Sequence, residues 1–195
     1  MGWITWILMM AGADQCIKEE IEAAGKENFP RELKGSRGKI TLHKSHNQGF
    51  PFQVLKERPE LVKTVPLIMV SALGGVLGFL LPKKGFLLEK TALSLTLGGA
   101  LSNLYDRLHR GYVVDYFSIN AGKLKKEIFN LGDMMIFAGA VLMFLSQIRA
   151  QLKEDSRSHF PAAFRLAQHS AGHAAEGADC QDGSQSLGVL LQTAG

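Results

Sequence analysis

Two aspartates in this 195-residue chain stand where an ionised side chain is costly. Asp115 lies within the apolar run Tyr112–Phe117, and Asp133 comes directly before the apolar segment Met134–Ile148. Ionisable groups in such surroundings are rare and are by default a functional hypothesis. Two carboxylates held close together there share one proton, because both cannot ionise cheaply. One can then activate water while the protonated one polarises a carbonyl group, which is the chemistry of an aspartic protease.

Spacing alone leaves simpler roles open for both residues. Asp133 could be a charge that favours the N-terminus of a helix. Asp115 could be the ion-pair partner of Arg107 or Arg110.

Three polar residues end the apolar segment that precedes Asp115. Asn103, Asp106 and Arg107 follow the spacing i, i+3 and i+4, so they share one helical face. A buried amide requires a hydrogen-bond partner. For Asn103 the candidates are a substrate backbone, Asp115 and Asp133.

The elements that position these residues are mostly apolar helices. The mean hydropathy of +0.05 is that of a soluble protein, but the apolar residues are clustered. Val65–Leu81 contains no charge and is the clearest membrane helix. Its Gly74, Gly75 and Gly78 predict close contact with another helix. We therefore expect a mainly α membrane protein with four transmembrane helices, at about residues 3–18, 65–81, 86–105 and 129–148; the first could instead lie on the membrane surface.

The remaining segments predict a small sheet and a tail. Lys39–His43 alternates polar and apolar residues as a strand does, so we expect β-structure within about residues 31–56. Phe50 and Phe52 fall on one face, where they either dip into the membrane interface or pack within a hairpin. Residues 154–195 have few large apolar side chains and no periodicity, so we expect a disordered tail after a domain of residues 1–153.

The net charge and the cysteine content indicate which binding partners and which kinds of site the chain can have. The net charge of +4 and pI of about 9.1 suit an anionic membrane surface, and no basic patch interleaved with aromatic residues indicates nucleic acid. Cys16 and Cys180 match no disulfide scaffold or zinc-ligand spacing. Lys83–Lys84 and Arg149–Lys153 favour a cytoplasmic location for both termini, although a plain count of Lys and Arg in the other connecting segments favours the reverse.

Four short motifs, in order along residues 1–150, make the chain resemble signal peptidase II, the bacterial family of lipoprotein signal peptidases. This family consists of integral membrane aspartic proteases. The motif D-Q-x-x-K is matched by Asp14, Gln15 and Lys18; N-x-G-x-A-F by Asn47, Gly49 and Phe52; G-G-A-x-G-N-x-x-D-R-x-x-x-G-x-V-V-D-F by Gly98, Gly99, Ala100, Asn103, Asp106, Arg107, Gly111, Val113, Val114 and Asp115; and F-N-x-A-D by Phe129, Asn130 and Asp133.

The resemblance implies a role for each matched residue. It makes Asp115 and Asp133 the catalytic pair. In the family pattern, Asn47, Asn103, Arg107 and Asn130 either line the substrate groove or steady the catalytic pair, and Asp14, Lys18, Gly49 and Asp106 have a supporting structural role.

The resemblance also implies the substrate and the setting. The substrate is a prolipoprotein whose cysteine carries a diacylglyceryl group, and the cut falls on the amino side of that cysteine. The enzyme is a multi-pass protein of the bacterial cytoplasmic (inner) membrane, with its active site and an extracytoplasmic β-cradle at the outer face. We further expect no metal or other cofactor, a monomer, and inhibition by globomycin-type compounds that mimic the peptide.

Four positions depart from the family pattern. Ser102 replaces a glycine, Pro51 a small residue, Tyr116 a phenylalanine and Gly132 an alanine. Serine and glycine are small enough to preserve close backbone approach, so we expect activity to survive. Pro51 is expected to stiffen the cradle, and residues 118–128 to form an outer loop over the site.

Other classes of function remain open on the residues alone. A serine mechanism at Ser102 or Ser118 is weaker, because the sequence shows no evident lysine or histidine base. A non-catalytic membrane protein that binds lipidated peptides would use the same groove without cutting. A transporter subunit would use the buried acids as a proton relay.

Overall fold

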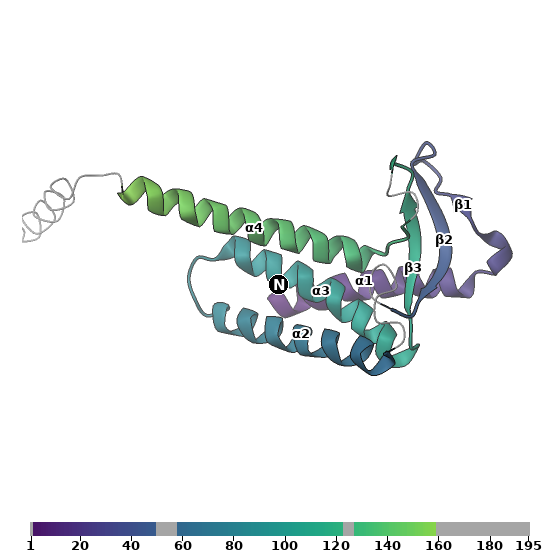
Figure 1. Cartoon of the computed structure of the whole chain (residues 1–195), viewed down its shortest axis with the longest axis horizontal. Helices are drawn as coiled ribbons and strands as arrows, with labels where there is room; N and C mark the ends of the chain where they lie inside the picture. Colours follow the sequence, from purple (N-terminus) through teal and green to yellow (C-terminus); the bar gives the residue numbers. More distant parts are fainter. Residues whose placement is uncertain (1, 50–57, 123–126, 159–195) are drawn as a thin grey trace, which may run out of the picture. The chain divides into compact units, whose positions relative to one another are not determined.

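The computed structural model describes residues 2–49, 58–122 and 127–158. The elements follow in the order α1 (Trp3–Ala23), a short 3-10 turn (Lys26–Asn28), β1 (Arg31–Glu32), β2 (Ile40–Asn47), α2 (Pro59–Leu80), α3 (Leu87–His109), β3 (Val113–Ile119) and α4 (Leu131–Ser158) (Figure 1). Residues 1–146 form one compact unit; a second unit begins at Gln147, and its described part is the helical segment that ends at Ser158.

Helix α3 is the central helix of the first unit, since both α1 and α2 pack against it (Figure 1). The apolar core of this contact consists of Ile7 from α1, Leu77 from α2, and Leu93 and Leu97 from α3. Leu93 and Leu97 are spaced i, i+4 and therefore lie on one face of α3. This packing holds the polar end of α3 in a defined position.

Glycines allow α4 to approach the backbone of α3. A Cβ atom at Gly99 would lie 2.2 Å from the carbonyl oxygen of Gly132, and one at Gly139 would lie 2.6 Å from that of Ala92. Only residues without a side chain permit such distances. The contact brings the first turn of α4, which carries Asp133, against α3.

The glycines of α2 do not have the role that the sequence predicted. Beyond the adjacent residues and the nearby backbone of α2 itself, no atom of the described residues lies within 4 Å of the Cβ positions of Gly74, Gly75 and Gly78. The prediction of a close helix contact there is wrong, because α2 packs against its neighbours through larger apolar side chains such as Leu73 and Leu77.

A three-stranded antiparallel sheet stands at one end of the helices, with β2 between β1 and β3 (Figure 1). Its register places Asn47 opposite Val113 and Ser45 opposite Asp115. On the face of β3 opposite Asp115, Val114 packs with Tyr116 and with Ile21 of α1. The expected mainly helical fold with a small antiparallel sheet is confirmed.

Helix α1 begins at the predicted residue 3, but several other helix bounds differ from the prediction. Helix α1 continues to Ala23 rather than 18, because Ile17 and Ile21 pack on the sheet and extend its apolar face. Helix α2 begins at Pro59, which suits the first turn of a helix. Helix α3 extends past 105 to His109, and α4 runs from Leu131 to Ser158, so the helix continues beyond the predicted end at 148 and into the predicted tail.

Two helices of the described chain are long and apolar enough to cross a membrane, namely Glu60–Leu80 and Leu131–Ser156. Their outward-facing side chains include Ile68, Phe79 and Phe144, each more than 60% exposed, which suits contact with lipid. Buried charges interrupt α1 and α3, so four spans stay a prediction. The predictions for Phe50, Pro51, Phe52, residues 123–126 of the outer loop and the tail from 159 onward lie outside the described residues.

Candidate active site

Asp115 is held on β3 by two amide groups. The residue is 5% exposed, and its carboxylate accepts hydrogen bonds from Asn130 Nδ2 at 2.8 Å and Asn47 Nδ2 at 3.2 Å. Burial, and after it the charge of Asp133, raises the pKa of Asp115 to about 7, although the hydrogen bonds from Asn130 and Asn47 act in the opposite direction. A carboxyl group with its pKa raised in this way is available as a proton donor near neutral pH.

Asp133 lies in the first turn of α4, where Asn130 caps the helix. The backbone N–H of Asp133 donates to Asn130 Oδ1 at 2.8 Å, and the N–H of Asn130 donates to Asp133 Oδ2 at 3.3 Å. This reciprocal pair is a capping box, and it explains why the helix begins at Leu131. The other oxygen, Oδ1, accepts a hydrogen bond from Asn103 Nδ2 at 2.9 Å.

Asn130 therefore contacts both aspartates. Its Nδ2 donates to Asp115 while its Oδ1 and backbone N–H bond to Asp133. Asn130 is fully buried, so its amide cannot exchange these partners for water. The two carboxylates that the sequence singled out belong to one site, where β3 meets the first turn of α4.

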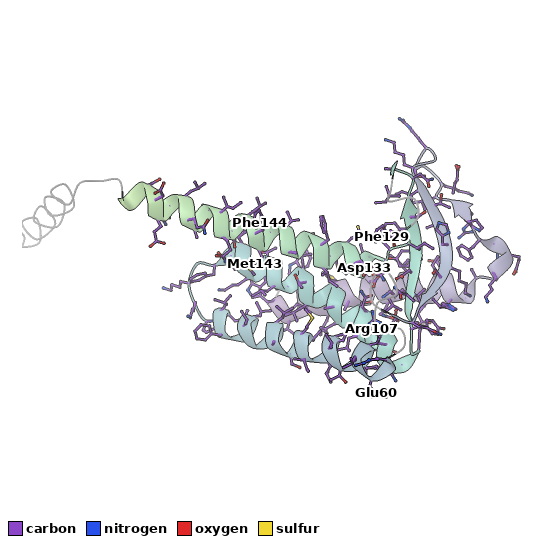
Figure 2. The ribbon with its side chains drawn as sticks, viewed as in Figure 1. Glu60, Arg107, Phe129, Asp133, Met143 and Phe144 are labelled. Carbon is purple, nitrogen blue, oxygen red and sulfur yellow. The ribbon has the colours of Figure 1, made fainter. Side chains whose placement is uncertain are left out.

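Arg107 and Gly49 support Asn47, the second asparagine that contacts Asp115. Arg107 Nη1 donates to the Gly49 carbonyl at 3.0 Å, and the Gly49 N–H donates to Asn47 Oδ1 at 3.0 Å. Asn47 is thereby oriented with its Nδ2 toward Asp115. Figure 2 shows Arg107 and Asp133 at the ends of α3 and α4 that face the sheet.

One alternative from the sequence, an ion pair between Asp115 and Arg110, is wrong. Arg110 pairs instead with Asp106 and, at 2.5 Å, with Glu19. The reason is the helical spacing, since Arg110 lies one turn after Asp106 on the same face.

A fully buried group of charges lies behind the site. Lys18 Nζ is 2.8 Å from Asp14 Oδ2 and 3.0 Å from Asp106 Oδ2, and all three side chains are inaccessible to solvent. Lys18 also donates to Asn103 Oδ1 at 2.8 Å. The same amide donates to Asp133, so Lys18 orients Asn103 toward the catalytic candidate.

Asp106 also joins this group to the strand that carries Asp115. Its Oδ2 accepts the backbone N–H of Val114 at 3.2 Å, directly before Asp115 in the chain. The structure thus brings all ten residues that the sequence assigned to the site into one connected set. These residues are Asp14, Lys18, Asn47, Gly49, Asn103, Asp106, Arg107, Asp115, Asn130 and Asp133.

Three further residues of this set were not assigned a role from the sequence. They are Gln15, Ser102 and Tyr116, whose side chains bond to Asp106 or Asp14. Ser102 and Tyr116 are two of the positions where the sequence departs from the family pattern. These departures were the sequence signal that could have pointed to a role for the two residues. Lys18 Nζ is 3.2 Å from Ser102 Oγ, so the expectation that this serine has no lysine nearby is wrong.

Ser118 likewise has a neighbour that the sequence did not reveal. His43 Nε2 lies 2.8 Å from Ser118 Oγ, and burial lowers the pKa of His43, so its ring is neutral near pH 7. Ser118 is nonetheless 1% exposed and lies on the face of β3 opposite Asp115. A hydroxyl that is buried away from the site is a poor nucleophile, so the serine mechanism stays the weaker alternative.

Comparison with known proteins agrees with this geometry. The family model described as "Signal peptidase (SPase) II" matches residues 6–149, which include every residue of the site. The chain belongs to the signal peptidase II family. The resemblance found in the sequence motifs is thereby confirmed, and with it an aspartic peptidase that removes signal peptides from prolipoproteins in a membrane setting.

Individual relatives support the family assignment. A lipoprotein signal peptidase of Moorella thermoacetica is 30% identical over 143 residues, which cover 73% of this chain and 90% of that protein. One from Mesorhizobium japonicum is 28% identical over 160 residues, covering 80% and 93%. A bacterial membrane enzyme determined by the in meso method at 2.3 Å shares the fold, with a TM-score of 0.66, 23% identity, and coverage of 76% and 88%.

Proposed function

We propose that Asp115 and Asp133 are the catalytic pair of this signal peptidase II. The substrate is a prolipoprotein with a diacylglyceryl-modified cysteine, and the peptide bond on the amino side of that cysteine is hydrolysed. The observation that carries the proposal is the double engagement of Asn130, which bonds to Asp115 and caps the helix at Asp133. A site that orients two carboxylates, one buried and one half-buried, through one amide is suited to acid–base catalysis.

The environments of the two carboxylates suggest their roles. Asp115 has a pKa raised to about 7, so it holds the shared proton and donates it. Asp133 lies at the N-terminus of α4, where the helix dipole favours negative charge, so it acts as the base. The pair titrates as a unit, and the active form carries one proton.

The reaction then proceeds in two steps. Asp133 takes a proton from water as the water oxygen bonds to the substrate carbonyl carbon, and Asp115 gives its proton to the carbonyl oxygen. In the second step the C–N bond breaks, Asp133 passes its proton to the departing nitrogen, and Asp115 takes back a proton from a hydroxyl of the intermediate. The pair ends with one proton, as it began.

The finer setting is part of the same proposal. Residues 1–153 form the peptidase domain, α1 to α4 all cross the inner membrane, and the site lies near the extracytoplasmic face beneath the β-cradle. Two observations support this arrangement: α2 and α4 have the length and composition of membrane spans, and Arg107 and Asp133 lie at the helix ends next to the sheet (Figure 2). Asn47, Asn103, Arg107 and Asn130 contact the peptide, globomycin-type compounds occupy the same groove, and the enzyme acts as a monomer.

The test is cleavage of a diacylglyceryl-modified prolipoprotein in detergent, with a chelator present throughout. Wild type is compared with Asp115→Asn, Asp133→Asn and Asp155→Asn, the last a matched change at an exposed position of α4. We expect each of the first two to lower kcat by about 10³-fold or more while the protein stays folded, and Asp155→Asn to retain full activity. Full activity in Asp115→Asn or Asp133→Asn would refute the catalytic pair; an inert wild type that still binds the peptide would favour the non-catalytic binder.

A further inference from the structure

The hydroxyl group of Tyr116 connects the buried charges with the start of α4. It donates to Asp14 Oδ1 at 3.0 Å and accepts the backbone N–H of Leu131 at 2.9 Å. Leu131 is the first residue of α4, two positions before Asp133. Tyr116 is 4% exposed, so water does not replace either partner.

Ser102 holds the same carboxylate from its other oxygen. Its hydroxyl donates to Asp14 Oδ2 at 2.6 Å and accepts from Lys18 Nζ at 3.2 Å. Lys18 in turn orients Asn103, whose Nδ2 donates to Asp133 at 2.9 Å. Asp14 is thus linked to Asp133 by two routes, one through Tyr116 and the helix start, the other through Lys18 and Asn103.

Both hydroxyls stand where the family motif has none, since it carries glycine at position 102 and phenylalanine at position 116. The two departures lie on different elements, α3 and β3, and yet meet at one carboxylate. Burial, followed by the negative charge of Asp14, raises the pKa of the Tyr116 phenol, so the hydroxyl remains a donor at every working pH. The arrangement is a connected unit rather than two separate substitutions.

We infer that Tyr116 and Ser102 are positioning residues for Asp133. Their two hydroxyl groups act as one unit through the carboxylate of Asp14. The inference rests on the proposed catalytic role of Asp133. The hydroxyls touch neither substrate nor water in the reaction; they hold the first turn of α4 and the Asn103 amide in register, so that the Asp133 carboxylate faces the reacting carbonyl. Small displacements of a catalytic group are costly to the rate.

The experiment deletes each hydroxyl without changing the packing of its side chain. Tyr116→Phe, Ser102→Ala and the double variant are compared in the prolipoprotein cleavage assay, with kcat and KM measured separately. Two controls remove hydroxyls that have no role in the unit. Ser94→Ala lies on the same helix as Ser102, and its buried hydroxyl has no hydrogen-bond partner among the described residues. Tyr105→Phe changes a residue that is 46% exposed.

We expect Tyr116→Phe to lower kcat about tenfold with KM within about twofold of wild type, because the misplaced group is used in the transition state and not in substrate binding. Because both hydroxyls act through Asp14, the double variant should lose little more than the more damaging single variant. Both controls should keep wild-type kcat. Thermal unfolding of each variant reports whether the protein remains folded at the assay temperature.

Three results would overturn the inference. The first is a kcat for Tyr116→Phe within about twofold of wild type. The second is a loss of kcat in Ser94→Ala equal to that in Ser102→Ala. The third is a loss of kcat in the double variant equal to the product of the two single losses, which would make the hydroxyls independent. Asp115→Asn is included in the same series. If Asp115→Asn is inactive while Tyr116→Phe is normal, only this inference fails; if Asp115→Asn is active, the proposed catalytic pair fails.

Discussion

Asn130 forms hydrogen bonds with both carboxylates of the site. Its side chain bonds to Asp115 and Asp133, and it caps α4. Replacement by alanine would free Asp115 from one of its two amide partners and would remove the cap, which alone is worth about 1 kcal/mol of stability.

For Asn130→Ala we expect kcat for prolipoprotein cleavage to fall by about 10²-fold, because both members of the pair lose orientation. The matched control is Asn120→Ala, which removes hydrogen bonds to Gly38 and Thr41 at the other end of the sheet. It should lower the unfolding temperature without changing kcat. Equal losses of kcat in the two variants would contradict a specific role of Asn130.

The pH dependence follows from the protonation of Asp115. If Asp115 donates the proton, kcat falls as the pH rises through its pKa of about 7, roughly tenfold for each further pH unit. The hydrogen bond from Asn47 lowers this pKa. Asn47→Ala removes this hydrogen bond and therefore raises the pKa of Asp115, so Asp115 stays protonated to higher pH. The descending limb of the profile should move to higher pH.

The measurement is kcat at saturating substrate across pH 6 to 9, about one pH unit below to two above the expected midpoint. Asn120→Ala, which does not touch Asp115, should leave the limb in place. If kcat of the wild type instead rises as the pH increases through about 7, the ionised form of Asp115 is the active one, which reverses the assigned roles.

At the level of elements, the contact between α3 and α4 determines where Asp133 lies. Gly99 and Gly132 meet at a distance that leaves no room for a methyl group. Gly99→Ala would push the first turn of α4 away from Asn103, whose amide reaches Asp133. We expect a loss of about 1–3 kcal/mol of stability, seen as a lower unfolding temperature, and a large loss of kcat.

Gly75→Ala in α2 is the matched control, because its Cβ position has no neighbour within 4 Å in the described part of the chain, apart from adjacent residues and the nearby backbone of α2. Alanine is the better helix former by about 1 kcal/mol, so this variant should be neutral or slightly stabilised. A Gly99→Ala variant that is as stable and as active as Gly75→Ala would show that α3 and α4 do not pack as described.

At the scale of the whole molecule, the buried charges join α1, α3 and β3. Lys18 lies between Asp14 and Asp106, and Asp106 also holds the backbone of β3. Removing one member of such a group leaves unpaired charge in the interior, which typically costs 3–5 kcal/mol. The charges therefore make the peptidase unit depend on all three elements at once.

We expect Lys18→Met to lower the unfolding temperature sharply and to reduce the yield of folded protein, since it leaves two buried carboxylates with less positive charge. Lys34→Met, at an exposed position, is the control and should have little effect. A normal unfolding temperature in Lys18→Met would contradict the stabilising role of the contacts between Lys18, Asp14 and Asp106.

The sequence by itself determined the family and singled out the two carboxylates that we propose as the catalytic pair. Asp115 and Asp133 stand out because carboxylates beside long apolar runs are costly, and the asparagines were marked by short motifs in which spacing is local. The apolar helices and the strand after Lys39 were also visible, since their periodicities extend over neighbouring residues. Their ends were less certain, because capping by Asn130 and packing of Ile21 depend on other parts of the chain.

Only the tertiary structure decided how these parts meet. It paired β2 with β3, selected Gly99 and Gly132 rather than Gly74 and Gly78 for close helix contact, and placed a histidine beside Ser118. It also brought Lys18 to Asn103, 85 positions away, and Tyr116 to Asp14, 102 positions away. A local pattern does not specify such partners, because buried polar groups find them only when distant elements pack together and exclude water.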